Sequence, residues 1–169
     1  MVTYGLTETC GGCIYDGEPL DGVEVEIQRG IIHISGATLA NVETTDGWFA
    51  TNDLGDLTDD GRWVVIGRAD RVIKSGGIKI SLDRVEQLAR LVPGVNEIAA
   101  APISDADWGQ RVGVVYTGSP EVADDIASAL ANDLGPAGRP VRILRTDKLP
   151  KLANAKTDLT AVQQLFEIG

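Results

Sequence analysis

Apolar and polar positions alternate in short segments over the first 68 residues, and this pattern predicts strands. Residues 23–27 alternate valine or isoleucine with glutamate, as a half-buried strand does, and residues 31–36 and 63–66 are further apolar segments. Asp-Gly pairs, which favour hairpin turns with positive φ at both central positions, stand between such segments. They occur at Asp16-Gly17, Asp21-Gly22, Asp46-Gly47 and Asp60-Gly61. The pattern predicts a small β-sheet or barrel and no helix.

After Asp70 the pattern changes to strands that alternate with helices. Residues 82–91 place apolar side chains on one helical face, and Pro93 and Gly94 end that helix. Three more segments have the length of strands, and two have the period of helices. The strands cover residues 95–101, 111–116 and 141–144, and the helices cover residues 120–132 and 158–166.

These patterns predict an α+β protein with two parts. A small β-barrel-like subdomain covers residues 1–69, and a mixed α+β domain covers residues 70–169. A chain of 169 residues is long enough for two small domains, each with a core of its own.

The charge balance disfavours two classes of partner. With 25 acidic and 15 basic residues the net charge is −10, which argues against nucleic acid and anionic membrane surfaces. No apolar run is long enough to span a bilayer, and the first residues lack the features of a secretory signal. We therefore expect a cytoplasmic protein.

Two local features allow sharper interpretations. Cys10 and Cys13 could form a redox pair or half of a zinc site, but zinc needs four ligands and only His33 could add to them. We favour a third interpretation, in which Cys10 and Cys13 are two thiols that line a glycine-rich turn. The chain also contains a basic cluster, which is either a solvated hairpin face or a site for a small polyanion. We favour the second interpretation because the chain as a whole is acidic. The cluster comprises Arg68, Arg71, Lys74, Lys79 and Arg84.

Four motifs stand in an order that resembles one enzyme family. They are Tyr-Gly-Leu-Thr-Glu-Thr at residues 4–9, Thr-Asn-Asp at 51–53, Gly-Arg-Ala-Asp at 67–70 with a glycine-bearing hairpin after it, and the 150–156 segment that ends at Lys156. This order resembles the AMP-forming acyl-CoA ligases of the adenylate-forming superfamily, and residues 4–21 look most like the o-succinylbenzoate–CoA ligases of menaquinone biosynthesis. The resemblance implies an acid–thiol ligase that uses ATP, Mg²⁺, coenzyme A and a small-molecule carboxylate.

The resemblance also implies roles for the residues of the first two motifs and for Arg68. Thr7 would lie near a phosphate, and the Glu8 carboxylate would contribute to magnesium binding. Tyr4 would pack near the adenine, although a plain core tyrosine fits the position as well. Asp53 would accept hydrogen bonds from the ribose hydroxyls, and the Arg68 guanidinium would hold the ribose from the other side.

The later motifs supply a hinge, a coenzyme A contact and a catalytic cation. Asp70 matches the hinge about which the small domain of the family swings. Lys156 matches the adenylation lysine, although Ala155 replaces the usual glycine before it. The hairpin would approach the pantetheine of coenzyme A because glycine removes side-chain obstruction. Its candidate residues are Lys74, Ser75, Gly76, Gly77 and Lys79.

The resemblance covers this whole chain, but it covers only the C-terminal part of the longer chains that are typical of the family. The phosphate-binding loop and most of the acyl pocket would belong to a missing N-terminal portion, so we expect this chain alone to be inactive. Met1 beside a motif fits a shortened chain, a split gene or a misplaced start. Three functions stay open: part of a CoA ligase, a carrier-loading adenylation domain, or a non-catalytic module that binds nucleotide or coenzyme A. A homo-oligomer also stays open.

Overall fold

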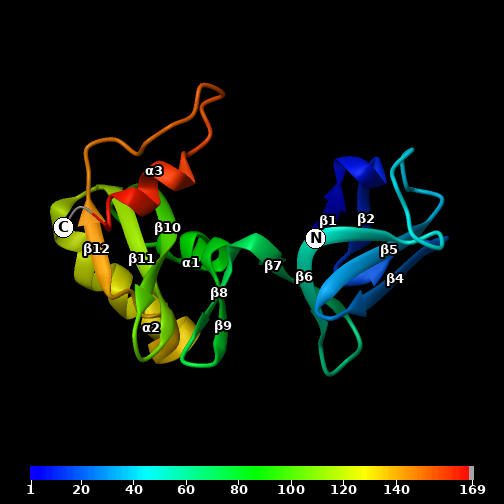
Figure 1. Ribbon diagram of the computed structural model, residues 1–169, viewed down its shortest axis with the longest axis horizontal. Helices are drawn as coiled ribbons and strands as arrows, with labels where there is room; N and C mark the ends of the chain where they lie inside the picture. Colours follow the sequence, from blue (N-terminus) through cyan, green and yellow to red (C-terminus); the bar gives the residue numbers. More distant parts are fainter. Residues whose placement is uncertain (168–169) are drawn as a thin grey trace. The chain divides into compact units, whose positions relative to one another are not determined.

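The computed structural model describes residues 1–167, and it divides the chain into two compact units, Met1–Asp70 and Arg71–Gly169. We call them unit 1 and unit 2 (Figure 1). The division falls one residue after the boundary that the sequence pattern predicts. Across the described residues, no helix is long and apolar enough to cross a membrane.

Unit 1 consists of two antiparallel sheets whose strands follow one another in sequence order. The three-stranded sheet contains β1 (Thr3–Leu6), β2 (Gly11–Tyr15) and β3 (Glu18–Pro19), with the single-turn 3₁₀ helix η1 (Thr7–Thr9) between the first two. The four-stranded sheet contains β4 (Val23–Gln28), β5 (Ile31–Gly36), β6 (Phe49–Leu57) and β7 (Trp63–Arg68). Both sheets are open, and over residues 1–70 they form no closed barrel.

The turns of unit 1 show where glycine is required. Asp16-Gly17 and Asp46-Gly47 have positive φ at both residues, as the sequence predicts, whereas Asp21 and Asp60 do not. The turn between β4 and β5 has φ of 54° at Arg29 and 87° at its glycine, so arginine here occupies a position that usually takes asparagine or aspartate. The core beneath these strands is small and consists of Cys13, Ile14, Val23, Ile32 and Ile34.

Unit 2 is an α+β domain built on one five-stranded sheet. Its strands are β8 (Val72–Ser75), β9 (Ile78–Ser81), β10 (Val95–Asp105), β11 (Gly109–Gly118) and β12 (Arg142–Arg145), of which β12 pairs in parallel with β11. Its helices are η2 (Ala69–Arg71) at the boundary, α1 (Leu82–Ala89), η3 (Pro120–Val122), α2 (Ala123–Gly138) and α3 (Leu159–Gln164). The α+β fold class predicted from the sequence is therefore confirmed.

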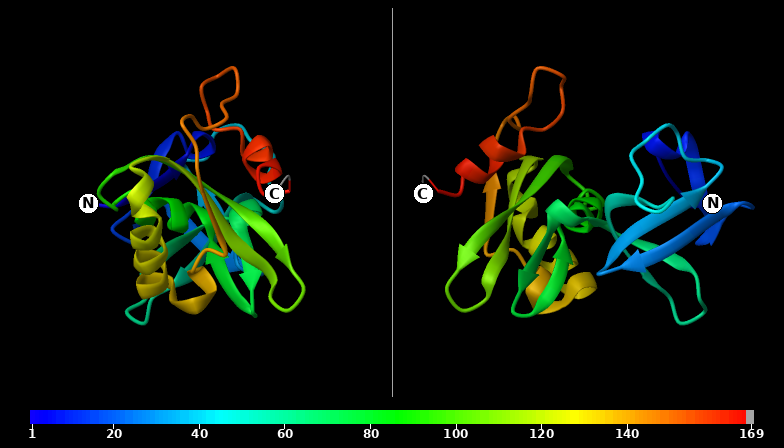
Figure 2. Two further views of the ribbon diagram at one scale, coloured as in Figure 1. Left: turned by 90° about the vertical axis from the view of Figure 1, so that its left-hand side faces the viewer. Right: turned by 45° about the vertical axis from the view of Figure 1, so that its right-hand side comes forward.

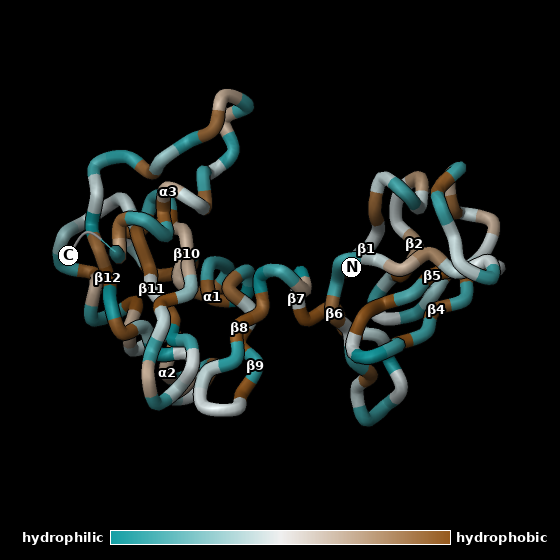
Figure 3. Tube along the Cα trace, in the orientation of Figure 1, coloured by the Kyte–Doolittle hydropathy of each residue, from teal (hydrophilic) through white to brown (hydrophobic). Residues whose placement is uncertain are grey.

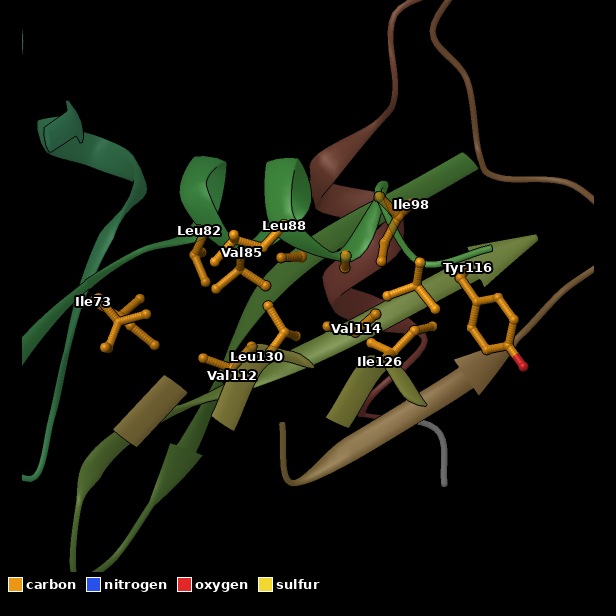
Figure 4. Packing of buried hydrophobic residues seen from close by; sticks show 14 of the residues in the cluster. Ile73, Leu82, Val85, Leu88, Ile98, Val112, Val114, Tyr116, Ile126 and Leu130 are labelled. Carbon is orange, nitrogen blue, oxygen red and sulfur yellow. The ribbon is translucent and has the colours of Figure 1, made fainter. Parts of the chain in front are cut away.

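Alternate residues of β10 face opposite layers of unit 2. Ile98 and Ala100 belong to the main core, which contains buried residues of α1 and α2 (Figure 4). Ala99 and Ala101 belong to a second core on the other face, which α3 covers. Buried valines also continue along β11, where Figure 3 shows hydrophobic colouring. A strand that is buried on both faces reads as a continuous apolar run, which is the pattern seen in the sequence.

Each helix of unit 2 has a local cause for its start or its end. The Ser81 hydroxyl accepts a hydrogen bond from Arg84 N at 3.2 Å and caps α1, and the Asp158 carboxylate caps α3 through Ala161 N at 3.0 Å. The α2 helix extends past the predicted end at residue 132. It is interrupted at Gly135, which has a non-helical φ of 70° and precedes Pro136.

Candidate active site

A small pocket in unit 1 brings three of the predicted residues together. It has a volume of about 100 Å³ and lies between the β1–η1 junction, β6 and the end of β7. Glu8, Asp53 and Arg68 line it, so the pocket presents two carboxylates and one guanidinium. The remaining lining residues are Leu6, Phe49, Thr51 and Asn52.

Asp53 is held in this pocket by its own strand. It is 8% exposed, and its backbone N–H donates to the Thr51 hydroxyl at 3.0 Å. That hydroxyl in turn donates to the carbonyl of Ile32 on β5 at 2.8 Å. Residues two apart on a strand share a face, so Thr51 fixes the backbone beside the carboxylate. Across the ladder, Asp53 is the Cα partner of Arg68.

Tyr4 contacts this carboxylate directly. Its hydroxyl donates to Asp53 Oδ2 at 2.7 Å, and burial together with the neighbouring carboxylate holds the pKa of Tyr4 well above its ordinary value. The phenol is therefore neutral and remains a donor at physiological pH. From the sequence, Tyr4 is expected to be either an adenine neighbour or a core residue. In the structure its hydroxyl also orients the Asp53 carboxylate.

We expect Tyr4→Phe to change how stability depends on pH. Because folding raises the pKa of Tyr4, its neutral form stabilises the fold below the ordinary tyrosine pKa of about 10, and this contribution is lost as pH rises above that value. The free energy of unfolding of the wild-type chain should fall above about pH 10, and Tyr4→Phe should remove part of that fall. Urea denaturation from pH 7 to pH 11 measures it. Tyr15→Phe, which keeps the Tyr4 hydroxyl, is the control; equal profiles for both variants would contradict the prediction.

The Thr-Glu-Thr segment after β1 forms a tight turn that its last threonine holds. The Thr9 hydroxyl accepts from Leu6 N at 2.8 Å and donates to Gly11 O at 2.7 Å. Thr7 is exposed, and Glu8 is partly buried in the pocket lining. Thr9 was not singled out from the sequence, although it lies inside the motif. Its hydroxyl thus holds the turn that contains Thr7 and Glu8.

Glu8 is the carboxylate that the sequence assigns to magnesium. Among the described residues, no group of three or more histidine, cysteine, aspartate or glutamate side chains gathers as a metal cluster. Mg²⁺ commonly binds through one or two carboxylates, with phosphate oxygens and water completing six positions. Glu8 could supply one such carboxylate.

Arg68 pairs with Asp70 at the end of unit 1. Its guanidinium donates to the Asp70 carboxylate through Nε at 2.9 Å and Nη2 at 3.3 Å. Both side chains are more than half exposed, and such pairs contribute at most about 1 kcal/mol.

The glycine-bearing hairpin of unit 2 has a packing reason for its first glycine. A Cβ at Gly76 would lie 2.7 Å from the Trp108 ring, and Gly76 N donates to Trp108 O at 3.0 Å. Gly76 and Gly77 both have positive φ. Exposed Lys74 and Lys79 are cross-strand partners, whereas the Ser75 side chain is buried.

Arg71 does not belong to the exposed basic cluster in which the sequence analysis placed it. Its side chain is 11% exposed and bonds Asp83 at 2.9 Å, the Ala100 carbonyl at 3.0 Å and Glu86. Glu86 also accepts from Ala100 N at 2.9 Å. These bonds attach the first residue of unit 2 to both α1 and β10.

Lys156 lies in the loop between β12 and α3, drawn in orange in Figures 1 and 2. Its side chain is exposed, its N–H donates to Asn154 Oδ1 at 3.1 Å, and its carbonyl accepts from Leu152 N at 2.8 Å. Ala155 has a φ of 65°, the left-handed conformation that suits glycine. The replacement of glycine noted in the sequence therefore keeps the turn but strains its backbone.

Ala155→Gly should stabilise unit 2. Left-handed backbone costs an L-residue roughly 1–2 kcal/mol, and the greater unfolded-state freedom of glycine offsets roughly 0.4–1 kcal/mol of the relief. We expect the free energy of unfolding to rise by about 0.5–1 kcal/mol, measured by denaturant unfolding. Ala161→Gly inside α3 should instead lower it by about 1 kcal/mol. A loss of stability in Ala155→Gly would show that the strain is absent.

The two cysteines are free thiols in different environments. Cys10 is exposed, with a φ of 54° at the end of η1, whereas Cys13 is fully buried on β2. Burial raises the pKa of the Cys13 thiol, which favours an apolar packing role over thiolate chemistry.

Comparison with known proteins identifies the family. Residues 84–156 match the family described as the AMP-binding enzyme C-terminal domain. The chain belongs to the adenylate-forming enzymes, and unit 2 contains their C-terminal domain. The resemblance found in the four motifs is thereby confirmed.

Particular relatives are ligases. The chain is 36% identical over 180 residues to a probable 2-succinylbenzoate–CoA ligase of Mycobacterium tuberculosis, covering 97% of this chain and 47% of that protein. It is 32% identical over 119 residues to a medium/long-chain-fatty-acid–[acyl-carrier-protein] ligase of the same species, covering 66% of this chain and 22% of that one.

A solved structure similar to this chain is an enzyme of the same type as the first relative. The o-succinylbenzoate CoA synthetase of Bacillus subtilis, in complex with the acyl-adenylate intermediate, has a TM-score of 0.82 and 25% identity. The match covers 95% of this chain and 40% of that one. The chain thus spans about half the length of the curated 2-succinylbenzoate–CoA ligase that it matches.

Proposed function

We propose that the chain is the later part of an AMP-forming acid–CoA ligase that acts on 2-succinylbenzoate in menaquinone biosynthesis. In the first step a carboxylate oxygen attacks the α-phosphorus of ATP and pyrophosphate leaves. In the second step the sulfur of coenzyme A attacks the acyl carbon and AMP leaves. The observation that carries the proposal is the pocket that unites Glu8, Asp53 and Arg68 in a chain that is 36% identical, over nearly its whole length, to a ligase of this type.

The pocket of unit 1 is proposed to bind ATP with its magnesium ion. Asp53, oriented by Tyr4, would accept hydrogen bonds from both ribose hydroxyls, and the Arg68 fork would donate to the ribose from the opposite strand. Thr7 would contact a phosphate. Glu8 would hold Mg²⁺ together with phosphate oxygens. The ion would neutralise negative charge on the oxygens of the reacting phosphate.

Unit 2 is proposed to supply mobile groups. Lys156 would act as a point charge on the carboxylate and the α-phosphate during the first step. The exposed Lys74 and Lys79 with the Gly76-Gly77 turn would face coenzyme A during the second, and Ser75, whose side chain is buried, would contribute through its backbone. Asp70 would be the hinge between the two arrangements, because it is the last residue before the firmly anchored Arg71.

Two other functions remain as alternatives. The likeness to a fatty-acid–[acyl-carrier-protein] ligase favours a carrier-loading enzyme as the second candidate. The third candidate is a non-catalytic half-protein that binds nucleotide or coenzyme A. In that case this chain alone would bind nucleotide or coenzyme A without forming a thioester.

A substrate panel distinguishes the candidates. The extended protein, in which the first half found in the relatives precedes this chain, is assayed for pyrophosphate release with 2-succinylbenzoate, 4-chlorobenzoate and dodecanoate. Thioester formation is then measured with coenzyme A and with an acyl-carrier protein as acceptor. Preference for 2-succinylbenzoate and coenzyme A supports the proposal. Preference for dodecanoate and the carrier protein supports the second candidate.

A further inference from the structure

The loop that carries Lys156 is closed at its base by backbone pairs. Asp158 N donates to Pro150 O at 3.0 Å, and Lys151 and Thr157 form an isolated β-bridge. Because Lys156 directly precedes this base, the orientation of the base sets where its side chain points. Figure 2 shows the loop projecting from the sheet of unit 2 in both views.

One ion pair ties this base to the sheet. The Lys151 ammonium contacts the Glu97 carboxylate of β10, and the two side chains are 28% and 45% exposed. Glu97 is itself fixed: the β10–β11 ladder shifts register between Val95 and Glu97, and Glu97 N donates to the buried Thr117 hydroxyl at 3.1 Å. A bulge of this kind re-aims a side chain, and here that side chain is the carboxylate that Lys151 contacts.

We infer that Glu97 is a positioning residue for adenylate formation, acting on Lys156 through Lys151; this rests on the proposed function of Lys156. Lys151 is joined to the sheet through its side chain and to Thr157 through its backbone, so the pair limits the directions in which the loop can point. The effect falls on the half-reaction that uses Lys156. A merely structural ion pair would affect both half-reactions alike.

A double-mutant cycle in the extended protein tests this role. Glu97→Gln and Lys151→Gln should each slow acyl-adenylate formation about fivefold, the upper end for a partly exposed ion pair, and leave thioester formation from preformed acyl adenylate unchanged. Because each variant removes the same contact, the double variant should also be about fivefold slower. Glu121→Gln, at an exposed glutamate of η3, is the control and should match wild type. Equal slowing of both half-reactions, or a multiplied loss in the double variant, would overturn the inference.

A second readout on this chain alone separates this inference from the proposed function. Amide hydrogen exchange over residues 151–157 should be about fivefold faster in Glu97→Gln and unchanged in Glu121→Gln. Unchanged exchange in Glu97→Gln would overturn the inference whatever the activity. Faster exchange in a protein that forms no adenylate would keep Glu97 as the group that orders the loop and refute only the assigned reaction.

Discussion

Lys156→Ala in the extended protein should slow acyl-adenylate formation by a factor on the order of 10²–10³ while leaving thioester formation from preformed acyl adenylate largely intact. Charge develops on the α-phosphate and on the attacking carboxylate in the first step, and a cation aimed at that charge contributes on the order of 10²–10³ in rate. Lys156 is exposed at the base of a projecting loop, so its removal leaves the core of unit 2 unchanged. Single-turnover measurements of the two half-reactions test this directly.

A nearby lysine provides the matched control for that experiment. Lys148 is also exposed and precedes the same loop, so Lys148→Ala changes the net charge equally. It should retain wild-type rates in both half-reactions. Equal loss in both half-reactions of Lys156→Ala would remove Lys156 from the adenylation step, because a cation used only in adenylation has no reason to affect thioester formation.

Arg71→Met should lower the free energy of unfolding of unit 2 by about 3 kcal/mol. The Arg71 guanidinium is 11% exposed, and its removal would leave the carboxylates of Asp83 and Glu86 together in a partly buried site. Breaking a buried ion pair by removing one partner costs about 3–5 kcal/mol, and we take the lower end because Asp83 is one-third exposed.

Hydrogen exchange of the slowest amides in β11 measures this loss, because the buried interior strand opens only when unit 2 unfolds. Arg90→Met, at an exposed arginine after α1, is the control and should cost less than about 0.5 kcal/mol. A loss below 1 kcal/mol in Arg71→Met would show that the network does not anchor the start of unit 2. The assignment of hinge motion to Asp70 would then lose its support.

The strands and helices could be read from the sequence where the periodic pattern is long. β10 and β11 carry continuous apolar runs, and α1 carries one apolar face between Ser81 and Pro93, so local pattern and tertiary burial agree there. The β4–β5 turn has arginine in a left-handed conformation, which turn propensities do not favour. The expected end of α2 near residue 132 lies close to the break at Gly135, where φ of 70° and ψ of −171° are not helical.

For the candidate site, the sequence identifies the residues but not the contacts between them. Glu8, Asp53 and Arg68 could be named from motifs, and they line one pocket. The contacts that orient them could not be predicted, because Tyr4 and Asp53 are 49 residues apart in the chain. Lys151 and Glu97 are likewise 54 residues apart, and only the folded sheet of unit 2 brings them together.

We propose, as the central claim, that this chain supplies a catalytic part of an adenylate-forming ligase and that activity also requires the segment that corresponds to the first half of its relatives. One measurement tests it most directly: pyrophosphate release and CoA thioester formation from 2-succinylbenzoate, compared between this chain and the extended protein. We predict both products with the extended protein and neither with this chain alone. Thioester formation by this chain alone, or neither product from a folded extended protein, would contradict the account.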